Sequence, residues 1–388
     1  MKTIFWGQPN QTNVVKRGEW IVPQKPVADG LLNLPLTNSL ENFGLGGPAT
    51  LTRASTATTS TTDVPFSGSQ VNTITPVLVN EARFWNATRV DHADGQDYGA
   101  GVPGIQYTGG DSGIMIEGGS TNLAVFSGDL LQWTAVNGAT ITDSITAAFD
   151  GVESQQLNQN GSPQAVIGQP YCGAMQVRCI TGSTNKRLRM RMGGVNTPNL
   201  IILDTWDYVY SDAITAVSAF QSSIRNRAEG GTDTFEITHV QYEQRLTATT
   251  PIISAGTNGV RADESLTADW PEEATQNITI KVEVTLIHDQ AGIILDAGNI
   301  SISYTGTAWE VKRGTDYCRY NVAATPGQTY VIEGDFTDAG LAIRVDGAPG
   351  STSPNVEAIS ATTAYIGSDS APAKHLHGLI KNLRIDDL

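Results

Sequence analysis

The sequence predicts a mostly β protein made of tandem antiparallel β-sandwich (jelly-roll) domains with an extended N-terminal arm. Three observations favour this fold class: apolar–polar alternation in many short segments, turn-forming clusters between those segments, and sparse helical signal. Of the 388 residues, 40 are Gly and only 16% are charged, and Thr, Ser, Asn and Ala fill the difference. Gly, Asn and Ser suit turns, and Thr and Val suit strands. The length indicates two or three domains, each able to bury a core.

Residues 1–50 form the predicted arm. The range contains prolines at positions 9, 23, 26, 35 and 48, and Pro removes a backbone donor and blocks helix. Between them lie pieces such as 20–22 and 31–34, which are too apolar for a solvated tail. We expect the arm to complete its packing against another protein. The alternative is an N-terminal strand that packs on its own domain.

Residues 51–123 are expected to be rich in strands and loops. The polar run ASTATTSTTD at 54–63 favours extended backbone, because Thr-rich sequences prefer strands, and it predicts an edge strand or an exposed loop. Mucin-like glycosylation is the other interpretation of such a run, but the N-terminus lacks the apolar core of a secretory signal.

The sequence predicts one β-sandwich over residues 124–262. Apolar and polar residues alternate in 174–180, 186–192 and 234–240, which is typical of half-buried antiparallel strands. Turn clusters divide these strands, at 158–161, 181–183, 193–194 and 229–231. Such spacing predicts a β-sandwich or jelly roll.

Residues 263–388 alternate even more regularly and read as a second jelly roll. In the segment ITIKVEVTL at 278–286 every second residue is apolar, so one face of the strand should be buried and the other exposed to solvent. Further strands are predicted at 292–296, 300–304, 308–312, 329–333 and 341–345. Two dipeptides, Asp346-Gly347 and Pro349-Gly350, then predict turns.

Three short motifs occur in order across 51–127: RASTA at 53–57, EARF at 81–84 and GIMIEGGSTNL at 113–123. Together they resemble a signature of tailed-bacteriophage tail, fibre and head-spike proteins. In that family TRAST, N-x-x-R-F and G-I-L-I-E-x-x-x-T-N-L segments precede a β-sandwich. The sandwich at 124–262 resembles the carbohydrate-binding-module-like domain that follows the signature, and Arg261-Ala-Asp263 resembles a T-R-A-A-D segment between modules. The closing segments YIG at 365–367 and LHGLIKNLRI at 376–385 resemble the end of laminin-G-like, concanavalin-type jelly rolls, and this resemblance covers about residues 265–388.

The resemblance implies a structural virion protein: a fibre, spike or decoration that contacts host-surface glycans. It also implies a homotrimer that attaches to other virion proteins through residues 1–50. The expected location is the virion, after assembly in the host cytoplasm and release by lysis. The first alternative is a purely structural capsid, neck or tail component without a ligand. The second is a polysaccharide depolymerase.

Charge and cysteine content narrow the function classes further. The net charge of −15 opposes binding to nucleic acid or to an anionic membrane. No apolar run approaches the roughly 18 residues that span a bilayer, so we expect no membrane insertion. The three cysteines, Cys172, Cys179 and Cys318, show neither metal-site spacing nor a disulfide framework, which fits a reducing compartment.

Two rows of side chains are candidates for glycan contact. If DTWDYVY at 204–210 is a strand, Trp206, Tyr208 and Tyr210 share one face, and aromatic faces stack on sugar rings. The second row is Arg187, Arg189 and Arg191, whose guanidinium forks suit the carboxylates of acidic glycans. The alternatives are that the aromatic row belongs to a core, and that the Arg row meets acidic neighbours in an assembly.

We expect no catalytic residue, no metal site and no enzymatic activity. The GDSG segment at 110–113 copies part of a serine-protease motif, but His92 is the only upstream His and lacks that family's context. His375 and His377 have no third ligand in sight. Ca²⁺ is the one cofactor left open, through two sets of carboxylates with Asx-rich turns as the alternative: Asp91, Asp94 and Asp97, or Asp289 and Asp296.

Overall fold

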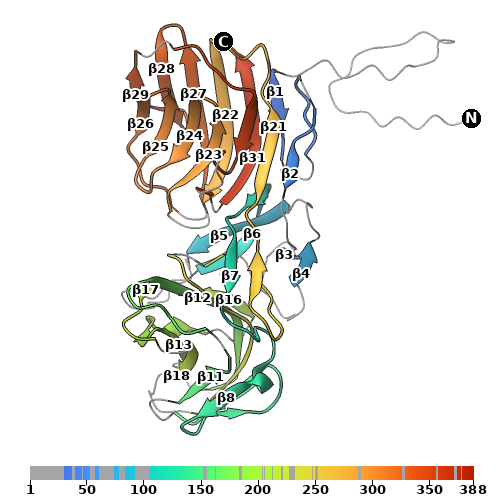
Figure 1. The fold of residues 1–388 in the computed structure, drawn as a ribbon, viewed down its shortest axis with the longest axis vertical. Coiled ribbons are helices and arrows are strands. Elements are labelled where there is room, and N and C mark those ends of the chain that lie inside the picture. The colour runs from blue at the N-terminus through green and yellow to red at the C-terminus, as the bar shows by residue number, and fades with distance from the viewer. Residues whose placement is uncertain are drawn as a thin grey trace, which may run out of the picture.

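The structure is a computed structural model, and Figure 1 shows two β-sandwiches stacked along the long axis of the molecule. It describes residues 30–36, 40–45, 47–52, 57–60, 74–77, 84–91, 105–151, 155–161, 163–182, 186–202, 204, 206–211, 213–219, 222–226, 232–246, 248–249, 252–286, 290–325, 328–354, 357–370, 374–376 and 378–388. The predicted fold class, a mostly β chain of tandem antiparallel sandwiches, is confirmed.

The C-terminal sandwich packs an eight-stranded sheet on a seven-stranded one. The first has the order β29-β28-β27-β22-β31-β6-β5, with β1 also paired to β31. Its strands are β1 (Leu32–Leu34), β5 (Phe84–Asp91), β6 (Ile105–Ile116), β22 (Ile278–Leu286), β27 (Thr329–Thr337), β28 (Gly340–Val345), β29 (Ala348–Ser353) and β31 (Gly378–Asp387). The second has the order β2-β21-β30-β23-β24-β25-β26. Its strands are β2 (Thr50–Thr52), β21 (Ser265–Asp269), β23 (Gly292–Ala297), β24 (Ile300–Tyr304), β25 (Trp309–Arg313), β26 (Asp316–Tyr320) and β30 (Thr363–Ile366).

The central sandwich consists of two six-stranded sheets. One has the order β16-β12-β19-β10-β9, with β17 paired to β12. It contains β9 (Thr140–Ile141), β10 (Thr146–Phe149), β12 (Pro170–Thr181), β16 (Asp207–Tyr210), β17 (Ile214–Thr215) and β19 (Asp233–Glu243). The other has the order β14-β13-β18-β11-β8, with β15 paired to β13. It contains β8 (Trp133–Val136), β11 (Gln156–Gln159), β13 (Arg187–Met192), β14 (Val195–Asn196), β15 (Leu200–Ile201) and β18 (Ser223–Asn226).

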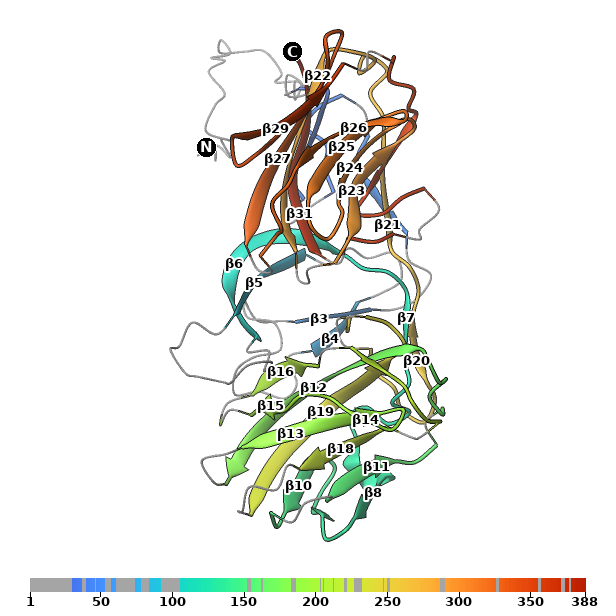
Figure 2. The same ribbon diagram turned by 90° about the vertical axis from the view of Figure 1, so that its left-hand side faces the viewer.

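Three smaller elements complete the description. A 3-10 turn, η1 (Leu130–Gln132), enters β8 and is capped by the Asp129 side chain. The strands β3 (Ala57–Ser60) and β4 (Ile74–Val77) pair with each other, so part of the polar run at 54–63 is extended as predicted. The strands β7 (Ser120–Asn122) and β20 (Gly259–Arg261) also pair, and they lie between the two sandwiches. Figure 2 shows β3 to β6 in the same intermediate zone.

The strand faces of the C-terminal sandwich follow the sequence pattern closely. Every apolar residue of β22 from Ile278 to Leu286 is fully buried, and each belongs to the core between the two sheets. The predicted turn at Asp346-Gly347 is confirmed, because both residues have positive φ in the two-residue loop between β28 and β29. The turn predicted at Pro349-Gly350 is wrong: both residues lie within β29, an edge strand, where Pro is tolerated.

The described part of the predicted arm belongs to the C-terminal sandwich. β1 pairs with β31, and β2 pairs with β21. The apolar residues of this stretch enter the same core as β22: Leu31, Leu32, Leu34, Leu36, Ala49 and Leu51. Residues 30–36 and 47–52 are therefore not a free extension, because their apolar side chains complete a core more than two hundred residues further along the chain. Residues 1–29 lie outside the described part.

Candidate functional site

Residues of the third motif, GIMIEGGSTNL at 113–123, lie where the chain crosses between the sandwiches. The first crossing, 117–122, leads from β6 into the central sandwich, and the second, 259–264, leads back into β21. The two crossings pair with each other as β7 and β20, with Ser120 opposite Arg261 and Asn122 opposite Gly259. We call this region, with the polar side chains packed around it, the junction.

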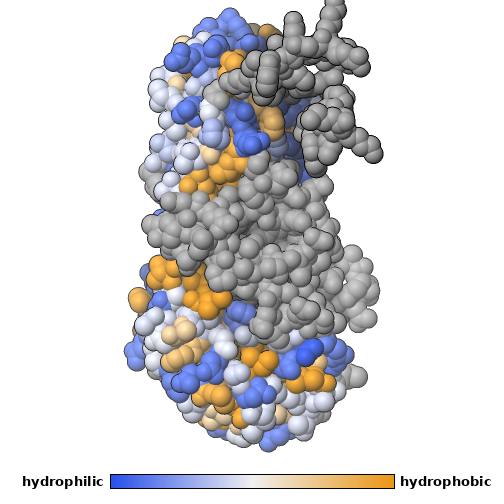
Figure 3. Space-filling model, turned by 90° about the vertical axis from the view of Figure 1, so that its right-hand side faces the viewer, coloured by the Kyte–Doolittle hydropathy of each residue, from blue (hydrophilic) through white to orange (hydrophobic). Residues whose placement is uncertain are grey.

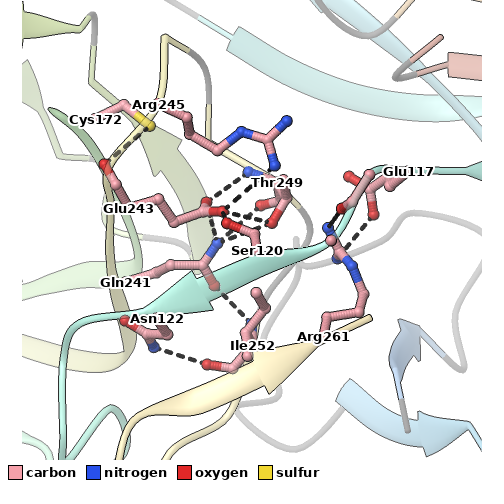
Figure 4. A network of polar contacts seen from close by, with 12 residues as sticks. Glu117, Ser120, Asn122, Cys172, Gln241, Glu243, Arg245, Thr249, Ile252 and Arg261 are labelled. Carbon is pink, nitrogen blue, oxygen red and sulfur yellow. Dashed lines mark hydrogen bonds and ion pairs between the residues drawn. The ribbon is translucent and has the colours of Figure 1, made fainter. Parts of the chain in front are cut away.

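A buried ion pair joins the two crossings. Glu117 Oε2 lies 2.9 Å from Arg261 Nη1, and both side chains are almost fully buried. Arg261 Nη2 also donates to the Gly118 carbonyl at 3.1 Å. The Glu117 backbone N–H donates to the Glu264 carboxylate at 2.8 Å, and the Glu264 N–H donates back to the Glu117 carbonyl. Figure 4 shows the guanidinium of Arg261 pointing at Glu117 from the neighbouring strand.

Gly119 allows this close approach of the two crossings. The Gly119 N–H donates to Asp263 Oδ1 at 2.6 Å. A Cβ at Gly119 would lie 2.9 Å from the Asp263 backbone nitrogen and 3.0 Å from the Arg261 carbonyl oxygen. Any larger residue would therefore push the crossings apart. Gly119 is thus explained by backbone contact, whereas a Cβ at Gly118 would lie 3.0 Å from the Nδ1 atom of the His375 side chain.

A second buried carboxylate, Glu243, ties the first crossing to the central sandwich. It is fully buried at the end of β19 and accepts hydrogen bonds from the Ser120 hydroxyl, the Gln241 amide and both the N–H and the hydroxyl of Thr249. Arg245 Nη1 lies 3.9 Å from the same carboxylate. These partners surround Glu243 in Figure 4. They balance the cost of burying a charge, and they occupy the lone pairs that general-base chemistry would need.

Asn122 is the third element of the junction. Its side-chain nitrogen donates to the carbonyls of Val240 and Ile252, at 3.0 and 2.7 Å. Its side-chain oxygen accepts from the backbone N–H groups of Ala124 and Tyr242, at 2.8 and 3.1 Å. One fully buried amide thus fixes the entry of the chain into the central sandwich.

His375 connects the junction to the C-terminal sandwich. Its Nε2 lies 3.1 Å from the Glu264 carbonyl oxygen and 3.8 Å from Asp263 Oδ1. Burial lowers the pKa of His375, and the Asp263 carboxylate opposes that shift. The neighbouring Leu376 enters the C-terminal core. The metal pair that we considered for positions 375 and 377 stays untested, since His377 lies outside the described residues.

Two members of the aromatic row predicted for glycan contact, Trp206 and Tyr210, are buried. Trp206, just before β16, is 1% exposed, and Tyr210 at the end of β16 is 5% exposed. Arg178 stacks over the Trp206 ring at 5.1 Å. Figure 2 shows β16 and β12 facing β3 to β6 across the intermediate zone. The expectation of an accessible aromatic row is therefore wrong for Trp206 and Tyr210; the Tyr208 side chain is not described.

The Arg row is placed differently. Arg187, Arg189 and Arg191 lie on the outer face of β13 and are partly exposed, whereas Leu188, Met190 and Met192 enter the core of the central sandwich. The predicted alternation of this strand is confirmed. Arg225 on β18 lies directly opposite Arg189, a neighbour that inspection of single strands could not reveal.

The remaining candidates gain no supporting geometry. His92, Asp94, Asp97 and Asp289 lie outside the described residues. Asp296 accepts a hydrogen bond from the Ser370 N–H at 3.1 Å. Within the described ranges no group of three or more His, Cys, Asp or Glu is arranged to hold a metal ion. No helix in the same ranges is long and apolar enough to cross a membrane.

No known protein family matches the sequence, and no curated protein matches it. Among solved structures, the chain is similar to a native heptameric SAP-like pentraxin from Limulus polyphemus, with 17% identity, a TM-score of 0.25 and coverage of 30% of this chain and 69% of that one. It is similar to domains LG4-5 of the mouse laminin α1 chain, with 11% identity, a TM-score of 0.24 and coverage of 70% and 88%.

A third similar structure is the Trypanosoma rangeli sialidase in complex with the inhibitor DANA, with 11% identity, a TM-score of 0.28 and coverage of 84% and 75%. Scores this low carry no argument about function. The assignment of the fold rests on the strand pairing of this chain itself.

Proposed function

We propose that this protein is a structural component of a tailed-bacteriophage virion, a fibre, spike or decoration that displays the central sandwich on the particle. The observation that carries the proposal is the junction. The contacts that hold the two sandwiches together use two motif residues, Glu117 and Asn122, and Arg261 from the second crossing. All three side chains are buried and bonded to neighbours in the junction, which suits a mechanical role.

Attachment to other virion proteins is assigned to the N-terminal end of the predicted arm. Residues 30–36 and 47–52 are engaged in the C-terminal sandwich, which leaves the segment before residue 30 for a particle partner. Deleting residues 2–29 should leave thermal unfolding of the purified protein unchanged but prevent its incorporation into particles. Deleting residues 2–52 is the matched control, because it also removes β1 and β2 and should destabilise the fold.

A homotrimer is the proposed assembly, since modules that bury little surface alone gain from packing around a shared axis. Exposed apolar residues beside the junction support it: Leu246 and Val260 are more than 60% exposed, and Ile253 is 44% exposed. Figure 3 shows separate groups of apolar side chains on both sandwiches. Sedimentation equilibrium should give three times the mass of the chain. A monomer at micromolar concentration would contradict the proposed trimer.

The decisive experiment is localisation. Antibodies raised against the recombinant protein should label purified phage particles in immunogold electron microscopy, at regular positions on the head, neck or tail. The rival function, polysaccharide depolymerase, is tested by incubating the protein with host polysaccharide and measuring new reducing ends. Absence of label on particles that pass the same purification, or a rise in reducing ends, would contradict the structural role.

A further inference from the structure

A continuous row of paired residues crosses the whole seven-stranded sheet of the C-terminal sandwich. Each strand contributes one residue, and each residue lies directly opposite the next. We call this row the ladder: Thr50, Thr267, Tyr365, Asp296, Ser301, Lys312 and Tyr317. Directly opposite residues on one face have Cβ atoms about 5 Å apart. The ladder is therefore one unbroken line of neighbouring side chains.

The ladder lies on the outer face of this sheet. In every strand a residue adjacent to the ladder belongs to the core between the sheets: Leu51, Leu266, Ile366, Leu295, Ile302, Val311 and Cys318. Because side chains alternate between the two faces of a strand, the ladder side chains point away from that core. Thr50, Lys312 and Tyr317 are exposed, and the other four are partly exposed. Figure 2 shows β23 to β26 on one side of the sandwich and β22 and β27 on the other.

The polar groups of the ladder are free, unlike those of the partner sheet. On the eight-stranded sheet three cations lie 2.6 to 3.0 Å from a carboxylate oxygen: Lys281, Arg344 and Arg384. Among the described residues, the Lys312 ammonium and the Ser301 and Tyr365 hydroxyls make no hydrogen bond or ion pair. Because these ladder groups also reach solvent, their donors and acceptors are available to a ligand. The partner sheet has already used its charged groups on each other.

Two tyrosines give the ladder aromatic surface at separate points. Tyr317 on the edge strand β26 is 50% exposed, and the guanidinium of Arg319 lies 4.3 Å from its ring centroid. Glu310 holds that guanidinium at 2.8 Å, so the ring is oriented before a ligand arrives. Tyr365 lies four strands away, about 19 Å at roughly 4.8 Å per strand. An aromatic ring that is already held in place loses little conformational freedom on binding.

We propose that the ladder binds a neutral polysaccharide lying across the strands, an inference that rests on the proposed function and names its ligand class. The tyrosine rings stack on the C–H faces of sugar rings, and Ser301 and Lys312 bind the hydroxyls between them. A polysaccharide repeats both features along its length, so one chain can reach both tyrosines. Several copies of the protein on one particle raise the effective concentration of these sites.

The charges of the ladder favour a neutral ligand over a charged one. Asp296 and Lys312 have opposite charges and lie on either side of Ser301, so the row has no net charge. The net charge of −15 opposes acidic polysaccharides and nucleic acid. A protein interface has an apolar core, whereas the ladder contains no Val, Leu or Ile. A chain of uncharged sugars therefore fits this row best.

The test uses the full chain and five immobilised probes: dextran, laminarin, mannan, alginate and a 30-nucleotide single-stranded DNA. Biolayer interferometry should show binding to at least one of the three neutral polysaccharides, with at least tenfold weaker binding to alginate and DNA. The double variant Tyr317→Ala/Tyr365→Ala should weaken that binding tenfold or more. Tyr317→Phe/Tyr365→Phe keeps both rings and should weaken it less than threefold.

Lys312→Ala should weaken binding two- to fivefold. Its matched control is Lys281→Ala, which removes an exposed lysine from the partner sheet and should leave binding unchanged. Circular dichroism should show that all variants keep the strand spectrum. Failure to bind any of the neutral polysaccharides, equal binding to alginate or DNA, or an unaffected Tyr317→Ala/Tyr365→Ala variant would overturn the inference. Particle labelling would remain positive in each of those cases, so the structural role is tested separately.

Discussion

The two sandwiches use polar residues in opposite ways. In the C-terminal sandwich, β22 buries its apolar face and turns Lys281 and Glu283 outward, where they pair with Glu333 and Lys381. In the central sandwich, β12 is buried on both faces: Val177 enters the core, and Gln176 on the other face is 0% exposed. The polar face of a strand can thus be as fully buried as its apolar face. The C-terminal sandwich is stabilised mainly by apolar burial, and the central one also depends on the junction.

The largest expected effect comes from breaking the junction. Arg261→Met leaves Glu117 as a buried unpaired carboxylate, which should lower the free energy of unfolding by about 3–5 kcal/mol. The double variant Glu117→Met/Arg261→Met removes both charges and should recover most of that loss. Urea unfolding followed by tryptophan fluorescence measures both. A double variant as unstable as the single one would show that the pair acts through packing alone.

A core truncation in the C-terminal sandwich should act through apolar burial instead. Ile280→Ala removes a fully buried side chain from β22 and should cost about 2–5 kcal/mol in urea unfolding. Lys281→Ala, the next residue on the same strand, is the control and should cost less than about 1 kcal/mol. Equal effects of the two variants would contradict the assignment of the strand faces.

A pH effect is expected from the central sandwich. Burial lowers the pKa of His239 to about 4, from an ordinary value of 6.5. The unfolded chain therefore binds this proton below pH 6.5, whereas the folded chain resists it until about pH 4. Stability contributed by the neutral ring is complete above pH 6.5 and is lost as the pH falls toward 4, by at most roughly 3 kcal/mol.

His239→Asn isolates this contribution. Residue 239 has a φ of 49°, and Asn tolerates that conformation without titrating. Urea unfolding at pH 7 and pH 4.5 should show a smaller loss of stability for the variant than for the natural protein. The same loss in both proteins would assign the acid sensitivity to other groups.

The smallest effect is expected at a surface ion-pair network. Arg344 on β28 contacts Glu333 and Asp335 on β27, at 2.9 and 2.7 Å. Because this site is partly exposed and screened by water, Arg344→Ala should change the unfolding free energy by less than about 1 kcal/mol. The difference should shrink in 0.5 M salt, and a loss near that of Arg261→Met would contradict the contrast between surface and junction pairs.

The features that depend on the alternation of apolar and polar residues were predicted from the sequence alone. The strands β22, β24 and β28 were expected from alternation, and so was the inward face of β13. Periodicity did not reveal the bulge in β19, where one extra residue at His239 shifts the register against β12. After the bulge the core positions change from Phe235 and Ile237 to Val240 and Tyr242. That shift turns Gln241 and Glu243 toward the junction.

The candidate site was predicted less well, because it depends on pairings between distant segments. The motifs contained Glu117, Asn122 and Arg261, but their spacing in the sequence says nothing of their mutual contact. The aromatic row at 206–210 was expected to be accessible, yet nothing in the local sequence shows that Trp206 and Tyr210 are covered. Arg225 became visible as a neighbour of the Arg row only through strand register.

The pairing of β1 with β31 sets the order in which the molecule can form. Leu32 lies opposite Ile385, so β1 can pair only after residues 383–385 have left the ribosome. The central sandwich is contiguous in the chain and can close while synthesis continues. Until β22 to β31 have been synthesised, the leucines of β1 and β2 have no core to enter, because that core is built from strands at 265–387.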